Sequence, residues 1–212
     1  MPYMTVQTIN QNKPKNIFMK HVKKLVVLAI AAFVVNASFA QMNSKMDNSM
    51  DKTVMVGGAA MYPTKNIIEN AVNSKDHTTL VAAVKAAGLV ETLQGKGPFT
   101  VFAPTNKAFN MLPAGTVDNL LKPENKASLT NVLTYHVVAG RLGSADLAKL
   151  IKAGNGTAEL KTVSGGKLWV MMKGKKIAIK DESGGVAYVT IKDVNQSNGV
   201  IHVIDHVALP KM

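Results

Sequence analysis

Apolar residues in the first half of the chain recur at helical spacing. Residues 67–72 follow the i, i+1, i+4, i+5 stripe of a helix that faces a core. A second stripe covers residues 80–87, after a candidate cap at Asp76 and before Gly88, which stands where a helix-ending glycine is expected. Further helices are predicted at 117–121, at 127–137 beyond Pro123, and from Ser144 to 151.

Two apolar segments about a hundred residues apart, 97–109 and 198–210, each carry a short buried strand bounded by its own turn or helix signals. In the first, Pro104 stops the strand and Thr105 is suited to cap the following helix. We expect the two segments to lie side by side. The predicted core members are Phe99, Val101, Phe109, Leu133, His136, Val200, Ile201, Val203 and Ile204.

The second half of the chain alternates instead of following a helical period. From Gly156 onward, apolar alternation at 160–162, 168–172, 177–179, 186–190 and 200–207 is separated by glycine-rich turns. This spacing is typical of an antiparallel meander. A helical first half followed by a strand-rich second half predicts an α+β fold, with the sheet partly covered by helices.

The N-terminal 40 residues have the pattern of a secretory signal peptide with a long basic region. Lys20, Lys23 and Lys24 precede eleven apolar residues at 25–35, and Ser38 and Ala40 are small residues at the −3 and −1 positions of a cleavage site. The apolar run is shorter than the roughly 20 residues that span a bilayer. We therefore expect cleavage near Gln41 and no stable membrane anchor, the alternative being an uncleaved anchor. The pattern leaves open whether the chain starts at Met1 or Met19.

Residues 41–61 are expected to form a Met-rich flexible linker before a domain at 62–212. Met42, Met46 and Met50 recur every four residues, and Met55 and Met61 follow. Thioether clusters can bind Cu(I), because soft sulfur suits that ion. The alternative is a linker that is simply rich in methionine.

Charge and cysteine content restrict the partners. The 25 basic residues, less the five that precede Gln41, leave 20 against 13 acidic ones, a net charge of +7 after cleavage. Arg141 is the single arginine of the sequence, which argues against nucleic acid. A basic exported protein is expected to meet acidic polysaccharide, the outer face of an anionic membrane, or acidic proteins. The absence of cysteine excludes a disulfide framework and a thiolate zinc site.

No arrangement of residues typical of an enzyme is recognisable, so no catalytic site and no cofactor are expected. His202 and His206 share one face of a predicted strand but lie about 13 Å apart at ~3.3 Å per residue, too far to chelate one metal. His136 lies on the apolar face of its helix and is read as a packed histidine, with a ligand or base as the alternative. His77 stands beside a helix cap and is expected to be exposed.

The chain resembles the fasciclin domain family over residues 62–210. The segment Gly97–Phe109 contains FTVFAPTN followed by Ala-Phe, Asn198–Pro210 contains NGVIHVID, and Tyr135-His136 matches the family's tyrosine–histidine pair. The resemblance implies an α+β fold, an antiparallel β-sandwich or wedge with several helices packed along it. It also implies a module for adhesion or matrix association, similar to those of periostin and the transforming-growth-factor-induced proteins.

The resemblance also implies candidate adhesion residues. They are Tyr135, His136 and the pair Asp193-Val194, which stands where the family has an Asp-Ile pair. Independently of the family, lysines gather on the predicted meander: Lys161, Lys167, Lys173, Lys175, Lys176 and Lys180. Lys173, Lys175 and Lys176 are the densest of these. A positive rim suits acidic glycans, although exposed strand lysines also block edge pairing.

The leading hypothesis is a secreted or periplasmic module that binds cell-surface or matrix proteins or acidic polysaccharide. The alternative is a periplasmic carrier of a small ligand, either Cu(I) on the Met-rich segment or a lipid or sugar in a cleft between sheet and helices.

Overall fold

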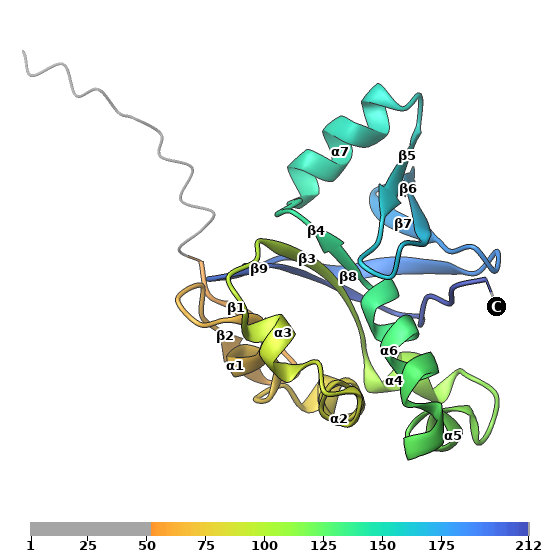
Figure 1. Ribbon diagram of the computed structural model, residues 1–212. Coiled ribbons are helices and arrows are strands. Elements are labelled where there is room, and N and C mark those ends of the chain that lie inside the picture. The colour runs from red at the N-terminus through yellow and green to blue at the C-terminus, as the bar shows by residue number, and fades with distance from the viewer. Residues whose placement is uncertain (1–51, 212) are drawn as a thin grey trace, which may run out of the picture. The chain divides into compact units, whose positions relative to one another are not determined.

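The computed structural model describes residues 52–211 as one α+β unit (Figure 1). Its helices are α1 (Ile67–Ala71), α2 (Thr78–Ala87), α3 (Val90–Gln94), α4 (Asn106–Asn110), α5 (Thr116–Leu120), α6 (Lys126–Tyr135) and α7 (Ser144–Ala153), with 3-10 turns η1 (Lys75–His77) and η2 (Pro123–Asn125). Its strands are β1 (Val54–Val56), β2 (Ala59–Met61), β3 (Phe99–Pro104), β4 (Val137–Ala139), β5 (Thr157–Lys161), β6 (Lys167–Lys173), β7 (Lys176–Lys180), β8 (Val186–Gln196) and β9 (Gly199–Ile204).

The main sheet has seven strands in the order β4-β3-β9-β8-β7-β6-β5. An additional bridge between Val138 and Thr162 joins the β4 edge to the chain after β5, so the sheet curls back on itself. The α+β class is confirmed. The expected antiparallel arrangement holds for every neighbouring pair except β3 and β9, which are parallel.

Strands β3 and β9 come from the two apolar segments that the sequence predicts to lie together, and they pair from Phe99↔Gly199 to Pro104↔Ile204. Both strands are buried on both faces because helices cover one side and the remainder of the sheet covers the other. Val101 and Ile201 belong to a cluster with the helices, whereas Phe102 and Ile204 belong to a cluster with β6–β8. Near-continuous hydrophobic runs are what such doubly buried strands require.

Local signals explain the helix limits. Asn66 begins α1 with a capping box, in which its side chain accepts from the Glu69 amide and Glu69 accepts from the Asn66 amide. Thr105 caps α4 as predicted, and Gly88 ends α2 with φ of 73°. Asp76, in contrast, caps nothing, because it lies inside η1 and His77 is the residue that precedes α2.

The prediction that residues 41–61 form a flexible linker is wrong for the last residues of that range. Val54–Val56 and Ala59–Met61 form a two-stranded hairpin, and the side chains of Val56 and Met61 are buried in the core. The ordered part therefore begins before Tyr62. The predicted signal peptide, its predicted cleavage site and the methionines at 42–50 lie outside the described residues.

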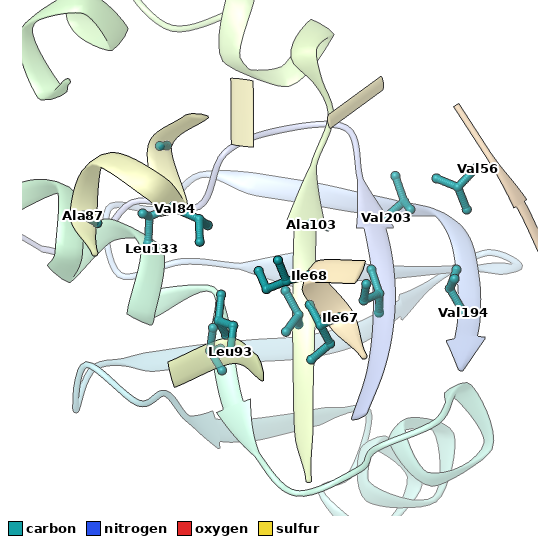
Figure 2. Packing of buried hydrophobic residues seen from close by; sticks show 14 of the residues in the cluster. Val56, Ile67, Ile68, Val84, Ala87, Leu93, Ala103, Leu133, Val194 and Val203 are labelled. Atoms are coloured by element: carbon teal, nitrogen blue, oxygen red, sulfur yellow. The ribbon is translucent and has the colours of Figure 1, made fainter. Parts of the chain in front are cut away.

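Two main clusters of apolar side chains form the core. The first joins α1, α2, α3 and α6 to one face of β3 and β9. Figure 2 shows Ile67 and Ile68 of α1 over β3, near Leu93 of α3. The second joins α7 to the inner faces of β5–β8 through Leu147 and Ile151, and it includes Phe102 and Tyr135.

The predicted core is confirmed, with Phe99 only partly buried and the other members buried. The prediction that His77 is exposed, made from its place beside a helix cap, is wrong. The residue is buried, with 4% of its surface exposed. Within residues 52–211, the helices are all too short or too polar to cross a bilayer.

Candidate functional site

The β6–β7 hairpin concentrates positive charge at an exposed tip. Lys173 and Lys176 are direct cross-strand partners, and Lys175 stands between them beside Gly174, whose φ of 60° permits the tight turn. All three lysines are exposed. Like charges placed directly opposite each other destabilise a sheet pair. The hairpin therefore carries a local electrostatic cost that an anion at the tip would relieve.

These three lysines have no acidic partner among the residues that the structure describes. The ion pairs of that part of the chain join Lys149 to Asp146, Lys167 to Glu159 and His206 to Asp205. Lys167 also faces Lys161 across β5–β6, but its Nζ lies 3.0 Å from Glu159 Oε1. The charge of that second lysine pair is thus partly compensated, whereas the charge at the hairpin tip is not.

The outer face of the same strands adds aromatic side chains that the sequence reasoning missed. Trp169 lies opposite Lys180 on β7 and opposite Glu159 on β5, while Tyr188 of β8 lies opposite Ala178. Both aromatic residues are partly exposed. The alternation of Lys167, Trp169, Met171 and Lys173, with buried Leu168 and Val170 between them, is the signal that could have identified this face. We call Trp169, Tyr188 and Lys180 with the three tip lysines the basic sheet face.

Tyr135, a candidate adhesion residue, is fully buried. Its hydroxyl donates to the Lys167 carbonyl at 2.5 Å and accepts from the Glu182 amide at 2.9 Å. Burial raises the pKa of Tyr135 to about 12, with the carboxylates of Glu182 and Asp181 adding to the increase and the Glu182 amide opposing it. The side chain joins the end of α6 to the start of β6 and the β7–β8 turn, and it offers no surface to a partner.

His136 is the C-terminal cap of α6 and is 3% exposed. Its Nε2 accepts from the Ala208 amide at 3.0 Å, so its Nδ1 carries the proton and donates to the Val132 carbonyl at 2.8 Å. Burial lowers the pKa of His136, although the Val132 carbonyl and Asp181 oppose the shift. The interpretation of a packed histidine therefore agrees with the geometry, and the ring locks the C-terminal segment onto α6.

Asp193 and Val194 lie at an irregularity of β8, where the register with β9 shifts between Ile191 and Val194. Asp193 has φ of 58°, and its carboxylate accepts from the Ser144 amide at 2.6 Å and the Ser144 hydroxyl at 2.5 Å, at the start of α7. Val194 is 1% exposed in the first core cluster. Asp193 thus holds α7 to the sheet, and Val194 is unavailable to a partner.

The predicted site residues therefore separate into two groups. The structure gathers Lys173, Lys175 and Lys176 at one exposed tip, while it places Tyr135, His136 and Val194 inside the domain. Within the part of the chain that the structure describes, no three His, Asp or Glu side chains gather closely enough to hold a metal ion.

Comparison with known proteins finds a family model and several relatives that each match more than half of this chain. The Fasciclin domain model matches residues 75–210. Protein sll1483 of Synechocystis sp. is 46% identical over 162 residues, which cover 76% of this chain and 83% of that protein. Immunogenic protein MPB70 of Mycobacterium bovis is 37% identical over 145 residues, 66% of each chain. Transforming growth factor-beta-induced protein ig-h3 of Sus scrofa is 36% identical over 148 residues, which are 70% of this chain but 20% of that longer protein.

A solved structure gives the same fold. The FAS1 domain pair of the insect cell adhesion molecule fasciclin I matches 74% of this chain and 57% of its own, with a TM-score of 0.62 and 18% sequence identity. The family match covers more than half of the chain and includes both paired strands, β3 and β9. The chain belongs to the fasciclin domain family.

Proposed function

We propose that this protein is an exported, non-enzymatic interaction module that binds acidic polysaccharide of the cell envelope or matrix through the basic sheet face. The observation that carries the proposal is the opposed pair Lys173 and Lys176, exposed at the hairpin tip without an acidic neighbour in the described chain. Retaining a repulsive pair at an exposed tip favours a role in attracting anions.

The neighbouring aromatic residues support a sugar polymer as the partner. Trp169 and Tyr188 lie on the same face as the lysines and are partly exposed. Aromatic side chains provide large apolar contact area at the protein surface. A carboxylated or sulfated polysaccharide offers both the anionic groups for the lysines and the ring surfaces for these side chains.

Membership of the fasciclin domain family also supports a role as an interaction module. Matched relatives include periostin and a transforming growth factor-beta-induced protein, and the matched structure is that of a cell adhesion molecule. The burial of Tyr135, His136 and Val194 moves the proposed contact away from those positions. Asp193 is only partly buried, but its carboxylate is already engaged by Ser144.

The test is binding of the purified protein to a defined anionic polysaccharide, such as alginate, measured by calorimetry at a series of salt concentrations. Exposed charges are screened over about 8 Å at physiological ionic strength, so the affinity is expected to fall steeply as salt increases. The triple variant Lys173→Glu, Lys175→Glu, Lys176→Glu is expected to abolish measurable binding.

A matched control reverses three exposed lysines elsewhere: Lys85→Glu, Lys107→Glu and Lys152→Glu. This variant has the same net charge as the hairpin variant, so a general charge effect would weaken both equally. Equal loss in the two variants, or wild-type affinity in the hairpin variant, would contradict the proposal. Trp169→Ala is expected to weaken binding without changing its salt dependence.

A further inference from the structure

Residues 205–211 follow β9 and form neither a helix nor a strand, yet most of them are buried or half-buried. Figure 1 shows this segment leading from β9 to the end marked C. Val207 packs with Ala108 and Phe109 of α4 in a third, smaller apolar cluster, and Ala208 belongs to the second main cluster. We call residues 205–211 the C-terminal strap. It covers part of the apolar surface of α4.

The backbone of the strap is held by side chains and not by a neighbouring strand. The Ala208 amide donates to His136 Nε2 at 3.0 Å. The Leu209 amide donates to Asp181 Oδ2 at 2.9 Å, and the Leu209 carbonyl accepts from the Ser183 hydroxyl at 3.3 Å. Two titratable side chains therefore accept the hydrogen bonds of two successive strap amides.

The bond from Ala208 requires one protonation state of His136. The Nδ1 of this ring lies 2.8 Å from the Val132 carbonyl, which can only accept, so Nδ1 carries a proton. Nε2 can then accept from the Ala208 amide only while the ring is neutral. A second proton, on Nε2, would set two N–H donors against each other across 3.0 Å. The closed strap and the protonated ring therefore exclude each other.

Burial keeps the ring neutral while the strap is closed. His136 is 3% exposed, and burial lowers its pKa, although the Val132 carbonyl and the Asp181 carboxylate oppose the shift. When the strap is open, Nε2 faces water, where a histidine has a pKa of about 6.5. Below about pH 6.5 the open form therefore binds more protons than the closed form, and acid favours opening.

Neighbouring elements bring three further titratable groups toward this region. Burial raises the pKa of Tyr135 in α6 to about 12, so its hydroxyl stays neutral. Glu182 in the β7–β8 turn accepts from the Lys167 amide at 3.0 Å. Burial also lowers the pKa of His77, which lines the same cavity as His136, so it adds no positive charge near pH 7. The proton that acid adds at the strap contact is therefore assigned to His136.

We propose that the C-terminal strap is an acid-sensitive latch, closed while His136 Nε2 accepts from the Ala208 amide and opened by a proton on that nitrogen. Opening uncovers Ala108 and Phe109, so acid exposes apolar surface on α4. The latch does not use the lysines or the aromatic residues of the basic sheet face, and its test is independent of polysaccharide binding.

The test is hydrogen exchange of backbone amides, followed by NMR on the purified protein from about pH 5 to 7.5 and corrected for the intrinsic exchange rate at each pH. The opening constant of the Ala208 and Leu209 amides is expected to rise by up to about tenfold for each pH unit below about 6.5, and to be independent of pH above it. Amides of Ile201 and Val203 in β9 should stay more protected at every pH, because the strap opens without unfolding of the domain.

Two variants assign the response to one histidine. His136→Gln places an amide oxygen close to the position of Nε2 and so keeps an acceptor that does not titrate. The Ala208 amide of this variant is expected to lose its pH response. His206→Gln is the matched control, because His206 belongs to the strap and its Nδ1 lies 2.8 Å from Asp205 Oδ1. This control should retain the wild-type response.

An opening constant of the wild-type strap that does not change with pH would overturn the proposal. So would an unchanged pH response in His136→Gln, loss of the response in His206→Gln, or strap amides that are as protected as those of β9. The wild-type measurement decides the question by itself if His136→Gln does not fold.

Discussion

Tyr135→Phe separates a structural role for this residue from an adhesive one. The change removes the hydroxyl that donates to the Lys167 carbonyl and accepts from the Glu182 amide. The ring itself stays in place, where it packs so closely on Gly166 that a side chain there would come within 2.7 Å of its Cε2. Two hydrogen bonds at about 0.5–1.5 kcal/mol each give an expected loss of roughly 1–3 kcal/mol in the free energy of unfolding.

Urea unfolding followed by circular dichroism measures this loss, with the denaturant slope expected to stay unchanged. Tyr188→Phe is the matched control, because the Tyr188 hydroxyl makes no hydrogen bond to the residues that the structure describes. Its unfolding free energy should change by less than about 0.5 kcal/mol, as is usual for surface substitutions. A Tyr135→Phe protein with wild-type stability but impaired adhesion would refute the buried, structural assignment.

The remaining predictions concern the core, pH, α7 and the N-terminus. Ile204→Ala, at a fully buried position of β9, should lower the unfolding free energy by about 2–5 kcal/mol in the same urea assay. Burial lowers the pKa values of His136 and His202, so the unfolded chain binds more protons than the folded protein below about pH 6.5. The free energy of unfolding should therefore be highest above that pH and fall below it, by up to about 1.4 kcal/mol per pH unit for each histidine. Urea unfolding at a series of pH values from 5 to 7 measures this fall. Asp193→Ala removes an acceptor and a negative charge from the start of α7 and should cost about 1–2 kcal/mol while leaving polysaccharide affinity unchanged. Intact-mass measurement of the exported protein should give a chain that begins within a few residues of Gln41, and full-length protein in the membrane fraction would contradict the predicted cleavage.

The sequence was most informative where two distant segments carried the same signal, an apolar strand with its own stop. The apolar strands 99–104 and 199–204 each carry a stop signal, and their pairing could be inferred because neither strand can be satisfied alone. Gly88 and Thr105 marked helix limits because their roles depend on local geometry. The direction of the β3–β9 pair was missed, since alternation reports burial and does not report which way a neighbour runs.

The misplaced residues have identifiable causes. The hairpin at 54–61 uses strands of three residues, which are too short to show a period. The register shift near Asp193 changes which side chains of β8 face inward, so Ala187 and Val189 are buried early in the strand and Val194 after the shift. His77 looked exposed because its neighbours are polar, but the fold places this residue in the interior, where it is buried. Such features depend on tertiary packing, to which a single sequence gives no direct access.

The central claim, that the basic sheet face and not the tyrosine–histidine segment contacts the partner, can be tested by one mapping experiment. Backbone amides of the purified protein are followed by 15N–1H correlation NMR during titration with alginate oligosaccharides. The largest shifts are expected at Trp169, Tyr188 and residues 173–176, with amides of 135–136 and 193–194 unchanged. Shifts confined to 135–136 and 193–194, with the hairpin silent, would contradict the account.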